Sequence, residues 1–106
     1  MVQKKQPSFK LETPGEVLKK HVVDANGVTQ DALALAMGVS RLTVNQLLND
    51  KRNITAEMAL RLAKVLSTSP EFWLDIQRDT DLLKAEQKLS DMLPKLRVLR
   101  EPSPPN

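Results

Sequence analysis

Hydrophobic residues return every three or four positions along most of the chain, and polar residues fill the positions between them. This spacing is typical of helices that bury one face. It predicts five helices, at about residues 14–26, 30–37, 41–49, 56–66 and 70–92. A residue whose side chain can cap a helix precedes each of them: Thr13, Thr29, Ser40, Thr55 and Ser69. The pattern therefore predicts an all-α fold, a compact domain of five helices.

The ends of the helices are marked by residues that stop helical geometry. Gly27 and Gly38 follow the first two helices, where a left-handed residue is expected. Pro94 interrupts the last one, because a proline pushes the preceding residue out of the α region. Residues 1–12 lack helical periodicity, and the chain ends in a proline-rich stretch. We expect a flexible N-terminal arm at 1–12, one folded domain at 13–93 and a flexible tail at 94–106.

The second and third helices are separated by only three residues, Gly-Val-Ser at 38–40. This arrangement is typical of a helix-turn-helix, whose second helix enters the major groove of DNA. The spacing of key positions resembles the motif's signature, which runs through Gln30, Ala34, Gly38, Val44 and Leu47. Ala34 lets the two helices approach each other, and Gly38 permits the sharp turn. The alternative is a plain helical hairpin within a bundle.

The outward face of the third helix is polar, which fits contact with DNA. Arginine reads guanine, asparagine or glutamine reads adenine, and an apolar side chain can meet a thymine methyl group. The residues expected to contact bases are Arg41, Leu42, Asn45 and Gln46. The residues expected to contact phosphates are Gln30, Ser40, Thr43, Asn49, Lys51 and Arg52. The alternative for each polar residue is that it is simply solvated.

Composition and charge narrow the classes of function. The net charge is +3, and residues 1–66 carry a net +4 against −1 for residues 67–106, so an anion-binding surface should lie in the first two-thirds. There is no cysteine and only one histidine, His21, which excludes zinc–thiolate and multi-histidine metal sites. The acidic residues near the C-terminus alternate with basic ones, as on a solvated helix. We therefore expect no metal, no cofactor and no enzymatic activity. No apolar run is long enough to cross a membrane.

Four stretches of the chain resemble HigA-type antitoxins of the Xre, or phage-repressor-like, helix-turn-helix family. They are P-G-E-V-L at 14–18, T-Q-D-A-L-A-L-A-M-G-V-S-R at 29–41, N-D-K-R-N-I-T-A-E-M-A-L-R-L-A at 49–63 and T-S-P-E-F-W-L-D-I-Q at 68–77. The resemblance covers roughly residues 13–83, and S-P-E-F-W-L is its most discriminating part, since generic Xre repressors usually lack it. It implies a lambda-repressor-like fold.

The resemblance also implies a role and partners. Such a protein would be bacterial, cytoplasmic and associated with the nucleoid. It would bind a palindromic operator as a homodimer and repress its own operon. It would also bind and neutralise a small basic toxin that resembles RelE-type mRNA endonucleases. Two alternatives remain: a stand-alone Xre-family repressor without a toxin, and a protein-interaction domain that has lost DNA binding.

The last helix carries two apolar stripes. One is expected to pack on the domain core: Phe72, Trp73, Ile76 and Leu83. The other lies on a different face, is spaced like a short coiled coil and is expected to form the dimer interface: Leu82, Ala85, Leu89 and Met92. Residues 13–93 would thus be a DNA-binding domain ending in a dimerisation helix. The alternative is that the second stripe packs back onto its own subunit.

Two regions could bind a basic toxin away from the third helix. The first is the N-terminal arm, where Phe9 and Leu11 are apolar residues without an obvious core partner. The second is the acidic side of the last helix, with Asp75, Asp79 and Asp81. Apolar anchors usually contribute more binding energy than exposed carboxylates. The sequence therefore favours the arm.

Overall fold

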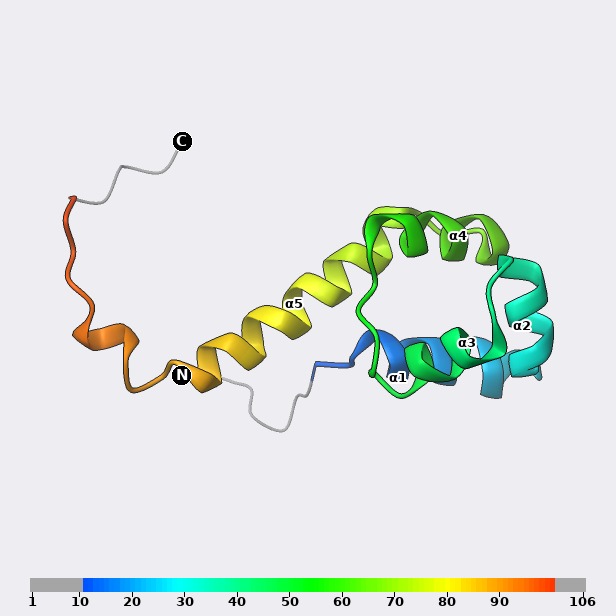
Figure 1. Ribbon diagram of the computed structural model, residues 1–106, viewed down its shortest axis with the longest axis horizontal. Helices are drawn as coiled ribbons and strands as arrows, with labels where there is room; N and C mark the ends of the chain where they lie inside the picture. The colour runs from blue at the N-terminus through cyan, green and yellow to red at the C-terminus, as the bar shows by residue number, and fades with distance from the viewer. Residues whose placement is uncertain (1–10, 101–106) are drawn as a thin grey trace, which may run out of the picture.

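The computed structural model describes residues 11–100, and within them the chain forms five α-helices and no strand (Figure 1). The all-α prediction is confirmed. The elements in chain order are α1 Pro14–Leu18, the π-helical turn η1 Lys19–Asp24, α2 Gln30–Met37, α3 Arg41–Leu48, α4 Ala56–Leu66, α5 Pro70–Lys88 and the 3₁₀ turn η2 Leu93–Lys95.

All five predicted caps are present. In each case the side-chain oxygen of the cap accepts a hydrogen bond from the backbone N–H three residues later. At α1 this becomes a full capping box, because the Glu16 carboxylate also accepts from the Thr13 backbone N–H at 2.9 Å. These bonds satisfy donors that a helix start leaves unpaired, so the sequence itself determines where each helix begins.

The first predicted helix is not uniform. After α1 the chain forms the π-helical turn η1, and helical geometry resumes only for residues 25–26. Leu18, Val22 and Ala25 are spaced in the sequence as on one face of a helix, but only Leu18 and Val22 are buried, whereas Ala25 is exposed. The cause is the wider π turn, which shifts every later residue around the axis. Gly27 then ends the helical segment with φ of +65°, as expected.

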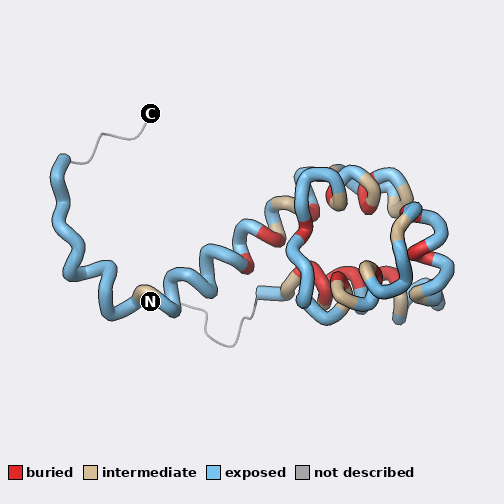
Figure 2. The backbone as a smooth tube through the Cα atoms, viewed as in Figure 1, coloured by how far each residue is buried: buried red, intermediate tan, exposed pale blue. Residues whose placement is uncertain are grey.

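The hydrophobic core lies where the five helices meet (Figure 2). Its largest fully buried side chains are Trp73, Leu18, Leu33, Leu47, Leu62 and Val44. Each helix contributes at least one of them, so none of the five folds independently of the others. Burying one such aliphatic side chain contributes about 1.5–3 kcal/mol. The packing of these side chains fixes the position of α3 within the domain.

Helix α5 is shorter than predicted and only its first half packs on the domain. It ends at Lys88 rather than near residue 92, and its second half extends away from the other helices (Figure 1). Trp73 is buried and Ile76 half-buried, but the prediction of core packing is wrong for Phe72 and Leu83, which are 43% and 38% exposed. The helix presents Trp73, Gln77 and Thr80 to the core. Phe72 lies about 100° from that face, and Leu83 lies beyond the end of the domain.

Candidate nucleic-acid interface

The turn between α2 and α3 has the geometry that a helix-turn-helix requires. Gly38 adopts φ of +70°, and the Val39 N–H donates to the Ala34 carbonyl at 3.0 Å. Ser40 then caps α3 by accepting from the Thr43 N–H at 3.0 Å. Val44 and Leu47 are fully buried against the domain. The opposite face of α3 is consequently directed outward.

Arg61 of α4 contacts the backbone of this turn. Its Nη1 donates to the Met37 carbonyl oxygen at 2.8 Å and lies 3.5 Å from that of Gly38, while Nη2 contacts Glu57 at 3.2 Å. A cation at the C-terminus of α2 satisfies carbonyls that the helix leaves unpaired. Sequence analysis missed this residue, because 23 to 24 positions separate the partners and no local pattern links them.

The end of α3 is closed by a Schellman motif. The Lys51 N–H donates to the Gln46 carbonyl at 2.8 Å, and the Asp50 N–H donates to that of Leu47 at 3.2 Å. Asp50 itself is left-handed, with φ of +56°. The motif reverses the chain, so residues 51–52 return alongside α3 instead of leaving it.

The Asp50 carboxylate ties this reversal to α1. It accepts from the Thr13 hydroxyl at 2.6 Å and from the Gly15 N–H at 2.9 Å. The two segments approach so closely that a Cβ on Gly15 would lie 2.6 Å from the Leu48 carbonyl oxygen. Sequence analysis did not single out Asp50 or Gly15, because their roles depend on a contact between segments 35 residues apart.

The predicted base-contacting residues lie together on the outer face of α3. Arg41, Leu42 and Asn45 are exposed, and Gln46 is half-buried. Leu42 is 64% exposed even though it is apolar. Arg41 lies 3.5 Å from Asp31 of α2, and both side chains are more than two-thirds exposed, so this weak ion pair leaves the guanidinium accessible.

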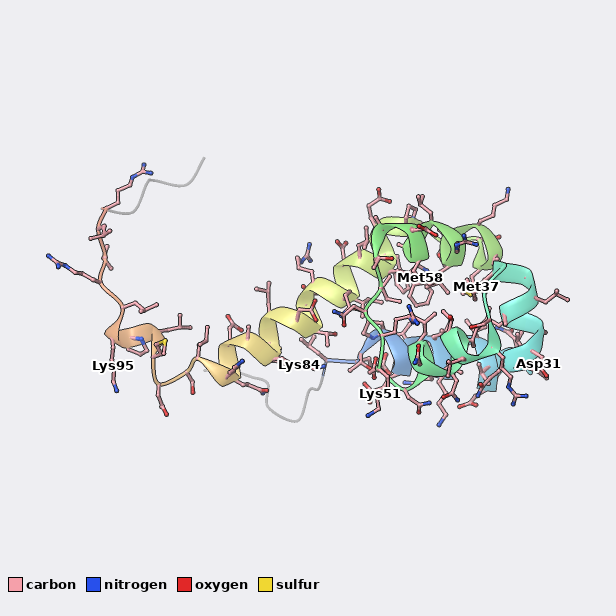
Figure 3. The ribbon with its side chains drawn as sticks, viewed as in Figure 1. Asp31, Met37, Lys51, Met58, Lys84 and Lys95 are labelled. Atoms are coloured by element: carbon pink, nitrogen blue, oxygen red, sulfur yellow. The ribbon has the colours of Figure 1, made fainter. Side chains whose placement is uncertain are left out.

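The predicted phosphate-contacting residues surround that face. Gln30 begins α2, Ser40 and Thr43 lie at the start of α3, and Asn49, Lys51 and Arg52 follow its end. In Figure 3, Asp31 of α2 and Lys51 of the loop after α3 are both labelled at the periphery of the domain. Hydrogen bonds join Gln30 to Asn45, Ser40 to Thr43 and Gln46 to Arg52, so these parts of the predicted surface lie together.

Several of these side chains are bonded to one another. The Asn45 amide lies 3.3 Å from the Gln30 amide oxygen, which joins the outer face of α3 to the start of α2. The Gln46 amide oxygen accepts from Nε and Nη2 of Arg52 at 3.0 and 2.8 Å. The Asn49 amide donates to the Asn45 carbonyl at 2.9 Å. The polar surface is therefore ordered by its own contacts.

The four residues expected to form the dimer interface lie on the second half of α5 and in the turn that follows it. Leu82 and Met92 are each 54% exposed, Ala85 is exposed and Leu89 is half-buried. Leu89 directly follows α5 and Met92 directly precedes η2, so the stripe is helical only in its first half. Within residues 11–100, none of these four side chains belongs to the hydrophobic core.

The region expected to bind a toxin is only partly within the described residues. Phe9 lies outside them. Leu11 is 41% exposed and lines a groove of about 590 Å³ between η1 and α5, together with Val17, Phe72 and Ile76. The charged groups around the groove have both signs: Glu12, Lys20, His21 and Asp79. Leu11 thus has apolar neighbours that the sequence did not predict.

No group of three or more histidine, cysteine, aspartate or glutamate residues within residues 11–100 is arranged to hold a metal ion. None of the helices formed there has the length and apolar character to span a bilayer.

Known proteins with similar sequences are bacterial regulators and antitoxins. Residues 18–73 match the family described as helix-turn-helix. The uncharacterised helix-turn-helix-type transcriptional regulator YbaQ of Escherichia coli is 38% identical over 85 residues, covering 80% of this chain and 75% of YbaQ. The antitoxin HigA-1 of Vibrio cholerae is 48% identical over 68 residues, covering 64% of each protein.

Solved structures place the fold in the same group. The antitoxin GraA superposes with a TM-score of 0.80 at 39% identity, covering 86% of this chain and 99% of GraA. GraA in complex with its operator gives a TM-score of 0.77 at 36% identity, covering 92% and 100%. The resemblance inferred from sequence motifs is confirmed. With its helix-turn-helix, its exposed polar α3 and these relatives, the chain belongs to the helix-turn-helix family of DNA-binding regulators that includes the HigA-type antitoxins.

Proposed function

We propose that the protein is the antitoxin of a toxin–antitoxin pair, which binds a palindromic operator as a homodimer, represses its own operon and neutralises a basic RelE-like mRNA endonuclease. It would act on bacterial DNA in the cytoplasm. The observation that carries the DNA part is the outer face of α3, where exposed polar side chains lie between the start of α2 and a basic loop. This is the surface that a recognition helix presents to the major groove.

The geometry supports specific roles in DNA binding. Arg41, Leu42, Asn45 and Gln46 would face base edges. The start of α2 at Gln30 offers unpaired N–H groups and a side-chain amide to a phosphate. The remaining phosphate contacts would flank α3 on both sides: Ser40, Thr43, Asn49 and Lys51. Arg52, to which the sequence also assigns a phosphate contact, donates two hydrogen bonds to Gln46 instead. The structure of GraA in complex with its operator supports DNA binding by this fold.

The homodimer would form through Leu82, Ala85, Leu89 and Met92. The exposure of Leu82, Ala85 and Met92 supports a partner rather than the same subunit, because the second half of α5 extends away from the other helices (Figure 1). An exposed apolar stripe on a protruding helix is typical of an association surface. Two recognition helices related by a two-fold axis would then meet half-sites about 34–36 Å apart, or a multiple of that.

The toxin would bind through the arm and the groove that Leu11 lines. The acidic side of α5 is less suited, because its carboxylates are already engaged. Arg78 contacts Asp75 at 3.2 Å and Asp79 at 3.1 Å, and Asp81 accepts from Gln77 at 3.0 Å. An apolar groove with flanking charges offers more buried area to a partner than paired surface ions do.

DNA binding is tested by mobility shift on the duplex directly upstream of the gene. We expect a shift that weakens about 10³-fold or more between 50 and 200 mM salt, because several phosphates are neutralised. A scrambled duplex of the same length is the control. An affinity that is the same at both salt concentrations and for both duplexes would indicate a protein-interaction domain that has lost DNA recognition.

The antitoxin role is tested by expressing the adjacent reading frame alone, with the full chain, and with a variant that starts at Thr13. We expect the neighbour to stop growth alone and the full chain to restore growth and co-purify. The Thr13 variant should fail to do either. If it succeeds, the arm is dispensable and the acidic side of α5 becomes the better candidate.

The second candidate is a stand-alone transcriptional repressor. The match to YbaQ, a protein described only as a transcriptional regulator, favours it. A neighbouring reading frame that is harmless when expressed alone would leave this candidate standing.

A further inference from the structure

The side chain of Gln46 is held in one orientation by Arg52. The Gln46 Oε1 atom accepts two hydrogen bonds from the same guanidinium, 3.0 Å from Nε and 2.8 Å from Nη2. Gln46 lies on the outer face of α3 and is half-buried, so its amide has less freedom than a fully exposed one.

This pair follows from the backbone. The Schellman motif at the end of α3 returns Lys51 to the Gln46 carbonyl, which brings the next residue alongside the Gln46 side chain. Asp50, the left-handed residue of the motif, is fixed by its bonds to Thr13 and Gly15. Arg52 is therefore placed against Gln46 by the loop that carries it.

The chemistry of the pair determines which amide atom faces outward. A guanidinium has only N–H donors, so the atom that faces Arg52 must be the amide oxygen. Two donated hydrogen bonds use both lone pairs of that oxygen. The NH₂ group is then left for a ligand, and Gln46 presents donors only.

A donor-only glutamine differs from the usual adenine reader. To read adenine with two hydrogen bonds, a glutamine donates to N7 and accepts from the N6 amino group. Here the accepting atom is occupied. Guanine presents two acceptors in the major groove, N7 and O6, and the NH₂ group of Gln46 can donate to either of them.

We propose that Arg52 is a positioning residue that makes Gln46 select guanine instead of adenine. The inference rests on the proposed function, in which α3 lies in the major groove. The competing assignment is that Arg52 contacts a phosphate and has no influence on base choice. In that case its guanidinium would leave Gln46 when DNA binds.

The test uses selection from a library of randomised double-stranded DNA, sequenced after binding to the full-length protein. Five proteins are compared: the wild type, Gln46→Ala, Arg52→Met, Arg52→Lys and the control Lys51→Met. Lys51→Met removes one positive charge from the same loop, at a residue bonded to Gln46 only through the backbone. Thermal melting by circular dichroism checks that each variant is folded.

The wild type should enrich a motif in which one position loses its preference in Gln46→Ala, and that position should hold guanine. In Arg52→Met the guanine-to-adenine ratio at that position should fall by about fivefold or more, the low end of what a bidentate base contact discriminates. Lys51→Met should weaken binding to all sequences and leave the ratio unchanged. Arg52→Lys, which keeps the charge but lacks the fork, should behave like Arg52→Met in base choice.

Three results would overturn the inference while DNA binding stands. In the first, the base position that depends on Gln46 holds adenine in the wild type. In the second, Gln46→Ala changes the preference at no base position, and in the third, Arg52→Met lowers affinity equally for all sequences, as Lys51→Met does. A wild type that enriches no motif at all would instead refute the proposed sequence-specific binding, and the inference with it.

Discussion

Two charged residues, Arg61 and Asp50, fix the segments on either side of α3. Arg61 donates to carbonyls at the end of α2, and Asp50 accepts from the first residues of α1. Both contacts satisfy backbone or capping groups that helix ends leave unpaired. The α3 helix contributes mainly Val44 and Leu47 to the core, so its orientation depends on these contacts as well as on packing.

At the residue scale we predict that Asp50→Ala lowers the free energy of unfolding by about 1–3 kcal/mol. The change removes two hydrogen bonds to a carboxylate and leaves a non-glycine residue in a left-handed conformation. Asp50→Asn should cost less, because asparagine tolerates that conformation and keeps an acceptor for the Gly15 N–H. Urea denaturation followed by circular dichroism measures both.

The control for this experiment is Asp91→Ala, which removes an exposed carboxylate outside the helices. It should change stability by no more than about 0.5 kcal/mol. Equal losses for Asp50→Ala and Asp91→Ala would contradict an anchoring role for Asp50.

At the scale of elements, the sequence predicted the starts of all five α-helices and did not predict the features that depend on tertiary contact. The caps from Thr13 to Ser69 are local, so a single sequence reveals them. The π turn at Lys19–Asp24 has no comparable local signal, and the periodicity therefore misplaced Ala25. Likewise, the apolar character of Phe72 and Leu83 predicted burial that the position of α5 does not permit.

On the polar face of α3, too, the sequence predicted what is local and did not predict what depends on tertiary contact. The composition of α3 and its flanks indicated which residues gather there, since a helix of known register has a known outer face. The bonds between Gln46 and Arg52 and between Gln30 and Asn45 depend on how the loop and α2 fold against α3. Sequence periodicity carries no information on such contacts.

At the scale of the whole molecule, the proposed DNA-binding surface and the proposed dimer interface lie on different parts of the structure. The domain that carries α3 is complete without the second half of α5, as the core lies among the packed helices (Figure 2). The stripe at Leu82, Ala85, Leu89 and Met92 is then available for a second copy. A single helix-turn-helix buries little surface on DNA, so affinity for an operator should depend on this pairing.

We predict that Leu89→Lys shifts the protein toward a monomer and weakens operator binding while the domain stays folded. The charge would have to be desolvated in the interface without a partner. Sedimentation velocity measures the assembly, and mobility shift on the operator duplex measures the affinity. The matched control is Leu60→Lys on α4, where a leucine is 61% exposed and distant from the stripe in sequence. An unchanged dimer in Leu89→Lys would place the interface elsewhere, with the first helix as the next candidate.

Arg61 grips main-chain oxygens at Met37 and Gly38, and main-chain groups are the same whatever side chains α3 displays. The hydrogen bonds from Arg61 thus do not depend on which side chains the outer face of α3 carries. If α3 reads the operator as proposed, substitutions on its outer face can change the preferred DNA sequence without compensating substitutions in the core. Duplicated copies in one genome could in this way become insulated from each other's promoters. The same property makes the chain a suitable host for grafting the outward residues of another regulator.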